Sequence, residues 1–277
     1  MKKLLLAAIC MGAIVMTEAQ QLRTPQPSTT QTVKQDFGLG GIELSYSRPN
    51  MKGRKIFGDL VPFDKVWRTG ANSATTLTFS DDVIIGGTKI PAGKYGLLTI
   101  PSANEWTIII TKQTDVTSPA AYKQDMDVVR VKAKPMALPW SFETFGMSFE
   151  NIKDNSLELM MAWDKTVVSL PISTDVEGKV MKQIETIMTK DNRPYFAAAA
   201  YYADNGKDLN QAVAWFDKAI EQNPQAFWIY YQKAKALAKQ GKKAEAMAVS
   251  AKSMELAKAA KNDDYVALNE KLQKDLK

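Results

Sequence analysis

Residues 75–100, TTLTFSDDVIIGGTKIPAGKYGLLTI, decide the fold of the first half of the chain. In the opening run, Thr75, Leu77 and Phe79 share one face of an extended segment, because side chains along a strand alternate between two faces. Two further runs, VII and TKI, flank the Gly-Gly pair at 86–87, which favours a tight hairpin turn. The stretch therefore predicts short strands joined by tight turns.

The same pattern extends over residues 31–173. Alternating or apolar runs of strand length recur there, and turn-forming residues such as those at 91–93 and 154–156 separate them. No segment of helix length intervenes, which argues against a parallel sheet with crossover helices. We expect about ten short, mainly antiparallel strands in a β-sandwich, with an open barrel as the alternative.

Residues 176–277 follow a helical period instead. An amphipathic segment begins at Val176, and the last helix is expected at about Asp263 to Leu276. Three turn-forming pairs divide the segment between them into helices of roughly 12–17 residues. These pairs are Asn205-Gly206, Asn223-Pro224 and Gln240-Gly241.

The helical part contains a repeat of the tetratricopeptide type. Small residues recur where paired helices must approach closely, and aromatic residues recur where the space between pairs must be filled. The later positions of the second unit have drifted to Ser250, Ser253 and Lys258, so a generic helical hairpin bundle stays open as an alternative. We expect an all-α, tetratricopeptide-like domain that engages a protein or peptide partner. Its first unit is carried by Ala199, Tyr202, Gly206, Ala212, Phe216, Ala219 and Pro224, and its second by Tyr230, Ala234, Leu237, Gly241 and Ala246.

The first 19 residues, MKKLLLAAICMGAIVMTEA, are typical of a secretory signal peptide. Two lysines precede an apolar run, and cleavage is expected between Ala19 and Gln20. The run is shorter than the roughly 20 residues that a membrane-spanning helix needs, so no membrane span is expected. Residues 20–30 are polar and proline-rich, which predicts a disordered leader. The protein is thus expected in the periplasm, at the cell surface or outside the cell.

Two missing residue types narrow the chemistry. The chain has no histidine, and its single cysteine, Cys10, would leave with the signal peptide. This excludes Ser-His-Asp and Cys-His catalysis, and it removes the usual zinc ligands. We therefore expect no metal site and no cofactor. Residues 176–277 carry 17 basic and 13 acidic side chains, spread without blocks of like charge. We therefore expect no nucleic-acid partner.

Four long motifs follow one another in the first half of the chain. They are S-R-P-x-x-K-G-R-K-I-F-G, L-V-P-F-x-K-V-W-R-T-G-A-N, I-P-A-G-K-Y-G-L-L-T-I-P and E-W-T-I-I. With them, residues 25–172 resemble the secreted bacterial proteins grouped as domain-of-unknown-function family 2911. The resemblance implies a bacterial envelope protein with a β-rich domain, followed in some relatives by a helical-repeat tail. It transfers no catalytic residue, because the family has no established activity.

The polar stretch at 46–72 carries the candidate ligand site. Arginine presents a planar fork that grips a carboxylate or a phosphate, tryptophan offers a stacking face, and asparagine both donates and accepts hydrogen bonds. If the two loops of this stretch meet, they form a pocket for a small anionic or glycan ligand. The residues predicted to line it are Arg48, Arg54, Trp67, Arg68 and Asn72.

A purely structural interpretation of this stretch is equally concrete. Trp67 would fill the core, and Arg68 would pair with Asp59 or Asp64. Gly70 and Asn72 would serve only to permit a positive φ in a turn.

The competing hypothesis is that the protein is an enzyme that uses paired carboxylates. Glycoside hydrolysis needs two carboxyl groups about 5–9 Å apart, and strand-adjacent acids can meet that requirement. We expect a non-catalytic binding or scaffold protein of the bacterial envelope, with a carboxylate-dependent hydrolase of envelope glycans as the alternative. The acids that would serve the hydrolase are Asp81, Asp82, Glu105, Asp125 and Asp127.

Overall fold

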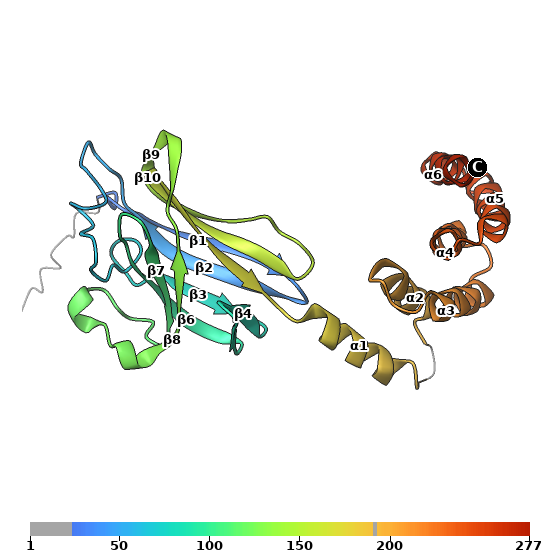
Figure 1. Cartoon of the computed structure of the whole chain (residues 1–277), viewed down its shortest axis with the longest axis horizontal. Helices are drawn as coiled ribbons and strands as arrows, with labels where there is room; N and C mark the ends of the chain where they lie inside the picture. The colour runs from blue at the N-terminus through green and yellow to red at the C-terminus, as the bar shows by residue number, and fades with distance from the viewer. Residues whose placement is uncertain (1–23, 191–192) are drawn as a thin grey trace, which may run out of the picture. The chain divides into compact units, whose positions relative to one another are not determined.

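The computed structural model describes residues 24–190 and 193–277, which divide into two compact units. The first unit ends at Thr174 and carries the strands, and the second starts at Asp175 and carries the α-helices (Figure 1). This boundary falls in the gap between the predicted domains. The predicted signal peptide, 1–19, and residues 20–23 of the predicted leader lie outside the described residues.

Within the described part of the first unit, ten strands form two antiparallel sheets, which confirms the predicted sandwich class. Neighbouring strands of the first sheet are β1 (Thr29–Phe37), β2 (Gly40–Arg48), β3 (Thr76–Phe79), β6 (Gly93–Ile100), β7 (Trp106–Thr111) and β8 (Asp127–Ala133). Those of the second are β5 (Thr88–Ile90), β4 (Val83–Ile85), β10 (Ser156–Ser173) and β9 (Met136–Glu150).

The core of this unit lies between the two sheets. Leu44 and Leu77 of the first sheet and Leu159 and Leu170 of the second are each fully buried in one apolar cluster. They occupy alternate positions of their strands, so the period of two in the sequence places one apolar face of each sheet inward. Removing this surface from water is the main force that holds the sheets together.

The Gly-Gly pair at 86–87 forms the predicted hairpin. Both glycines have positive φ, 56° and 77°, and Ile85 pairs with Thr88 across a two-residue turn. Positive φ at both central positions is a requirement of the turn that matches strand twist, and glycine meets it without steric cost. The hairpin joins the second sheet through Ile85 and Ile172, whereas the flanking strands β3 and β6 belong to the first. The stretch that predicts the strands therefore also connects the two sheets.

Two details depart from the expectation of short strands that start at residue 31. The first strand begins at Thr29, inside the predicted leader, because residues 29–30 pair with residues 47–48 of β2. The runs SLELMMAW and TVVSLPI form a single 18-residue strand, β10. The pairing register shifts around Asp164, whose φ is 49°. A bulge of this kind bends a strand without ending it, so a break in alternation does not here mark a turn.

β9 lies at the edge of the second sheet, and side chains of β2 satisfy part of its free edge. The Tyr46 hydroxyl accepts from the backbone N–H of Met147 at 2.7 Å and lies 3.2 Å from the Met147 carbonyl. Arg48 Nε donates to the carbonyl of Phe145 at 3.0 Å, and Phe145 N–H donates to the carbonyl of Pro49 at 2.9 Å. The backbone polar groups of Phe145 and Met147 therefore have partners.

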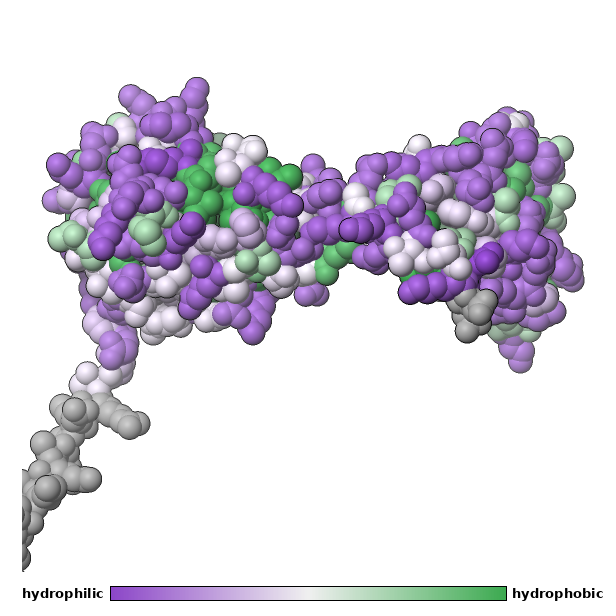
Figure 2. Space-filling model, turned by 90° about the horizontal axis from the view of Figure 1, so that it is seen from below, coloured by the Kyte–Doolittle hydropathy of each residue, from purple (hydrophilic) through white to green (hydrophobic). Residues whose placement is uncertain are grey.

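In the second unit, the described residues form six α-helices. They are α1 (Val176–Ile187), α2 (Tyr195–Asp204), α3 (Leu209–Gln222), α4 (Phe227–Lys239), α5 (Lys243–Ala259) and α6 (Asp263–Leu276). All three predicted breaks fall between helices. No helix in the described ranges is long and apolar enough to cross a membrane. On the face shown in Figure 2, hydrophobic residues gather on the β unit, whereas the helical unit is mainly hydrophilic.

The repeat residues lie where a tetratricopeptide-like packing needs them. Ala199, Ala212 and Ala219 are buried in one cluster with the ring of Phe216. Tyr202 and Trp215 meet edge to face, with ring centroids 4.8 Å apart. The absence of a long side chain at the alanines lets the helix axes come close, and the aromatic rings fill the remaining space.

The drifted positions of the second repeat unit have a role of their own. Ser250 and Ser253 are both fully buried, and Asn269 of α6 bonds to each of them at 2.9 Å. Ser253 also donates to the carbonyl of Phe227 at 2.8 Å. A buried polar network adds specificity when its groups find partners, so these serines attach α6 to α5 and α4 where a typical repeat has apolar packing.

Candidate ligand-binding site

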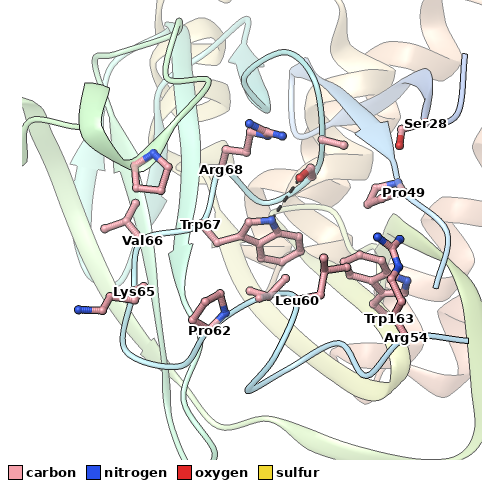
Figure 3. A pocket seen from close by; sticks show the side chains of 14 residues that line it. Ser28, Pro49, Arg54, Leu60, Pro62, Lys65, Val66, Trp67, Arg68 and Trp163 are labelled. Carbon is pink, nitrogen blue, oxygen red and sulfur yellow. Dashed lines mark hydrogen bonds between the residues drawn. The ribbon is translucent and has the colours of Figure 1, made fainter. Parts of the chain in front are cut away.

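The β unit contains a cavity of about 400 Å³ that brings together three of the five predicted site residues. Arg54, Trp67 and Arg68 line it, together with Trp163 from β10. In Figure 3, the Trp67 indole lies at the centre, with Arg68 on one side and Arg54 on the other. The two loops of the polar stretch therefore meet at this cavity.

Trp67 is fixed by both its backbone and its ring. Its backbone pairs with Thr99 of β6 through two hydrogen bonds of 2.7 and 2.9 Å. Its ring stacks on Trp163, with centroids 5.9 Å apart and planes 18° apart, and packs against Phe57 and Phe145. The indole N–H donates to the carbonyl of Gly70 at 3.2 Å. Trp67 thus packs on the core and also presents apolar ring surface to the cavity.

The corner that follows Trp67 is strained. Thr69 is fully buried and has a φ of 56°, which is unusual for a β-branched residue. It is held by a 3.0 Å contact between its hydroxyl and that of Thr99 and by the Thr75 hydroxyl, which donates to its carbonyl at 2.7 Å. Gly70 has a φ of 152°, and a Cβ there would lie 2.9 Å from the carbonyl oxygen of Ser47. Such strain persists only where the surroundings enforce it, and here it lies directly after Arg68 in the chain.

Arg68 is short of acceptors. Its Nη1 donates to the carbonyl of Thr117, whereas its Nε is buried and has no hydrogen-bond partner in the described part of the chain. Within those same residues it forms no ion pair with Asp59 or Asp64, contrary to the structural interpretation. A buried donor without an acceptor is costly, so this guanidinium favours an additional acceptor.

Arg54 is held by its own loop. Its Nε donates to the carbonyl of Met51 at 2.8 Å, and its Nη2 donates to the carbonyl of Asn50 at 2.7 Å. These bonds fix the guanidinium and leave its Nη1 group for another partner. No carboxylate in the described ranges pairs with it. Arg54 therefore presents a positioned positive charge to the cavity.

The charged side chains that line the cavity are all of one sign. Its lining includes three basic side chains, those of Arg54, Lys65 and Arg68, and none of its described lining residues is acidic. Like charges in a concave site create a positive potential that attracts anions. The cavity therefore suits an anion that also has an apolar or ring-shaped face for Trp67.

Each of the two units contains a segment that matches the sequence model of a known family. The sequence model of a family described as "Protein of unknown function (DUF2911)" matches residues 28–172. The chain belongs to this family. A tetratricopeptide-repeat model matches residues 215–248, which cover the second part of α3, all of α4 and the start of α5. No curated protein and no solved structure matches the chain. The resemblance and the repeat expected from the sequence are thereby confirmed.

Two predicted site residues lie elsewhere in the DUF2911 domain. Arg48 lines a separate groove of about 560 Å³ with Trp140 and Phe142, so its grouping with the other arginines is wrong. Arg48 lies two residues after Tyr46 in β2, so both side chains are on the same face of the strand and point toward β9. Asn72 has a φ of 54° and donates to the carbonyl of Ser28 at 2.9 Å. It supports a residue of the cavity wall without lining the cavity.

Other residues of the DUF2911 domain that line the cavity were not predicted from the sequence. Trp163 shares the inward face of β10 with Leu159, so its alternation indicates a core residue and nothing more. Pro119 belongs to the loop that also supplies the Thr117 carbonyl for Arg68. Neither carries a local sign of a ligand site, because their relation to Trp67 depends on pairing between distant strands.

The loop around Thr117 and Pro119 is anchored by a polar cluster. The Tyr122 hydroxyl donates to Asp127 at 2.5 Å, and Arg130 donates to both side chains at 2.9 and 3.0 Å. Burial first, and the bond to Asp127 second, raise the pKa of Tyr122 to about 12. The cluster therefore holds this wall of the cavity in place while Tyr122 is protonated.

The candidate acids of the hydrolase alternative do not line the cavity. Glu105 pairs with Lys132 at 3.2 Å and Asp127 with Arg130 at 3.0 Å. Asp82 pairs with Lys89 at 2.9 Å and accepts from the N–H of Ala92 at 3.1 Å. Each of these contacts stabilises a turn or a strand end of the DUF2911 domain. Among residues 24–190 and 193–277, no group of three or more metal-ligating side chains is placed to hold an ion.

Proposed function

We propose that this protein is an exported, non-catalytic binding protein of the bacterial envelope. The observation that carries the proposal is the cavity lined by Arg54, Arg68 and the Trp67 ring, none of whose described lining residues is acidic. Charge-assisted hydrogen bonds from arginine are among the strongest that a binding site offers to an anion. The ligand of the β unit is therefore a small anion or an acidic glycan.

The helical unit supplies the second binding function. A tetratricopeptide repeat indicates a protein-interaction role, and here it takes a protein or peptide partner. Export rests on the first 19 residues, whose two lysines and apolar run have the pattern of a cleavable signal. One chain then links a soluble anion in the envelope to a protein partner.

A thermal-shift screen of residues 20–277 tests the ligand. Neutral sugars, sugar acids and phosphate esters are compared on the wild type, on Arg68→Ala and on Arg48→Ala. A ligand of the cavity raises the melting temperature of the wild type and of Arg48→Ala but not of Arg68→Ala, because Arg48 lies in another groove. An equal shift in all three proteins contradicts the cavity as the site.

Export is tested separately by intact-mass measurement on protein from a bacterial periplasmic extract. The mass should correspond to a chain that starts at Gln20. A chain that retains Met1 and stays with the cytoplasmic fraction contradicts the envelope assignment.

A further inference from the structure

The cavity holds more information than its charge, because its two arginines present different hydrogen-bonding edges. Among the described residues, Arg68 finds an acceptor only for Nη1, whereas Arg54 finds acceptors for Nε and Nη2. The fork of a guanidinium binds a carboxylate through two parallel N–H groups, and each arginine keeps a different set of N–H groups for a ligand. Because they also lie on opposite sides of the Trp67 indole (Figure 3), they form two separate subsites.

Trp67 separates these subsites. Figure 3 shows the indole between Arg68 and Arg54, with Pro62 and Leu60 beside it, while the Lys65 side chain extends away from the ring. The only polar atom of the indole is already bonded to Gly70. The middle of the cavity consequently offers apolar ring surface, on which a sugar ring or another flat face can stack.

The size of the cavity limits the ligand. Ligand pockets range from about 300 to 1,000 Å³, and this one, at about 400 Å³, is near the lower end. A single inorganic anion would fill little of this volume, whereas a ligand of one or two rings matches it better.

Resting on the proposed function, we infer that the ligand of this cavity is an acidic saccharide with two carboxylates, one for Arg68 and one for Arg54. The ring that joins the carboxylates lies on Trp67. Two negative charges balance the two arginines that line the cavity, neither of which has a carboxylate partner in the described part of the chain. The ligand is thus recognised by the separation of its charges as well as by their sign.

Isothermal titration with three probes tests this inference: glucuronate with one carboxylate, digalacturonate with two, and neutral maltose. In the wild type, digalacturonate should bind about tenfold more tightly than glucuronate, because one further charge-assisted bond forms. Maltose should bind weakest. Arg54→Gln should abolish the preference for digalacturonate and still bind glucuronate, and Arg54→Lys should restore part of it.

Three further variants complete the design. Arg68→Gln should no longer bind either acidic probe, and Arg68→Lys, which keeps the charge, is its conservative control. Arg48→Gln should bind the probes like the wild type. Equal affinity of the wild type for glucuronate and digalacturonate overturns the two-carboxylate inference and leaves anion binding intact. Failure of every acidic probe to bind wild-type protein of native circular dichroism overturns the inference and the proposed function of the cavity together.

Discussion

The two units of this chain use side-chain volume in opposite ways. The core of the β unit is filled with large rings, including the fully buried Trp106, Trp163 and Phe145. The core of the helical unit is built largely on alanines such as Ala199, Ala212 and Ala219. Sheets stand about 10 Å apart and need long side chains between them, whereas helices pack more closely when small residues lie at the crossing.

The units also differ in the distance along the sequence that their contacts bridge. In the helical unit, from α2 onward, each helix packs mainly on the next, as α2 does on α3 and α4 on α5. In the β unit, β3 pairs with β6, and β4 pairs with β10. A periodic pattern alone is therefore enough to anticipate the helical unit, but not the partners of the strands.

The largest expected effect comes from removing volume in the β unit. Trp106 is 2% exposed, and its ring lies 4.9 Å from that of Phe57. Trp106→Ala should lower the free energy of unfolding of this unit by about 3–5 kcal/mol, since a cavity remains where the ring was. Hydrogen exchange followed by mass spectrometry should show the loss of protection in strands only. Equal loss in the helices would mean that the two cores do not unfold separately.

In the helical unit, adding volume should be harmful. Ala212 is fully buried in the helix-packing cluster, and Ala212→Leu should cost about 1–3 kcal/mol through overpacking. The exposed Ala214 lies on the same helix, so Ala214→Leu is the matched control and should change stability little. Urea denaturation monitored by helical circular dichroism measures both variants. A neutral Ala212→Leu would show that the helices do not approach closely at this residue.

The next prediction concerns the stability contribution of a helix N-cap, again in the helical unit. Asp208 caps α3 by accepting from the N–H groups of Asn210 and Gln211 at 2.8 and 3.3 Å. Asp208→Ala should cost about 1 kcal/mol, whereas Asp208→Asn should keep most of the cap. Urea denaturation compares the two, and an equal loss in both variants would assign the effect to charge and not to capping.

The last expected effect concerns pH and the wall of the cavity in the β unit. The pKa of Tyr122 is raised to about 12 in the folded protein, above about 10 in the unfolded chain. The protonated hydroxyl therefore stabilises the fold below pH 10, and this contribution is lost as pH rises from about 10 to about 12. Denaturation at several pH values should show a shallower decline for Tyr122→Phe than for the wild type. Parallel declines would contradict a role for this hydroxyl.

Much of the fold follows from local chemistry. The hairpin at 86–87, the three helix breaks and the alanine positions of the repeat are predictable because turn preference and periodicity act within a few residues. The continuity of β10 is not predictable in this way. Its bulge at Asp164 interrupts alternation as a turn would, and only pairing with β9 shows that the strand continues.

The candidate site is predictable to a similar extent. Arg54, Trp67 and Arg68 come from loops that are close in sequence, and the abundance of arginine near turn residues is enough to group them. Arg48 comes from the same stretch but lies in another groove, since the strand direction of β2 decides where it points. Trp163 joins the site from a distant strand, and nothing in its neighbourhood in the sequence indicates this.

The hydroxyl of Tyr46 and the guanidinium of Arg48 occupy the outer rim of β9 at Phe145 and Met147. An open rim is a template on which another polypeptide can continue the sheet, and fibres grow in this way. Here that part of the template is closed from within the same molecule. Two side chains that take no part in the ligand cavity thereby close this part of the edge to pairing with another strand.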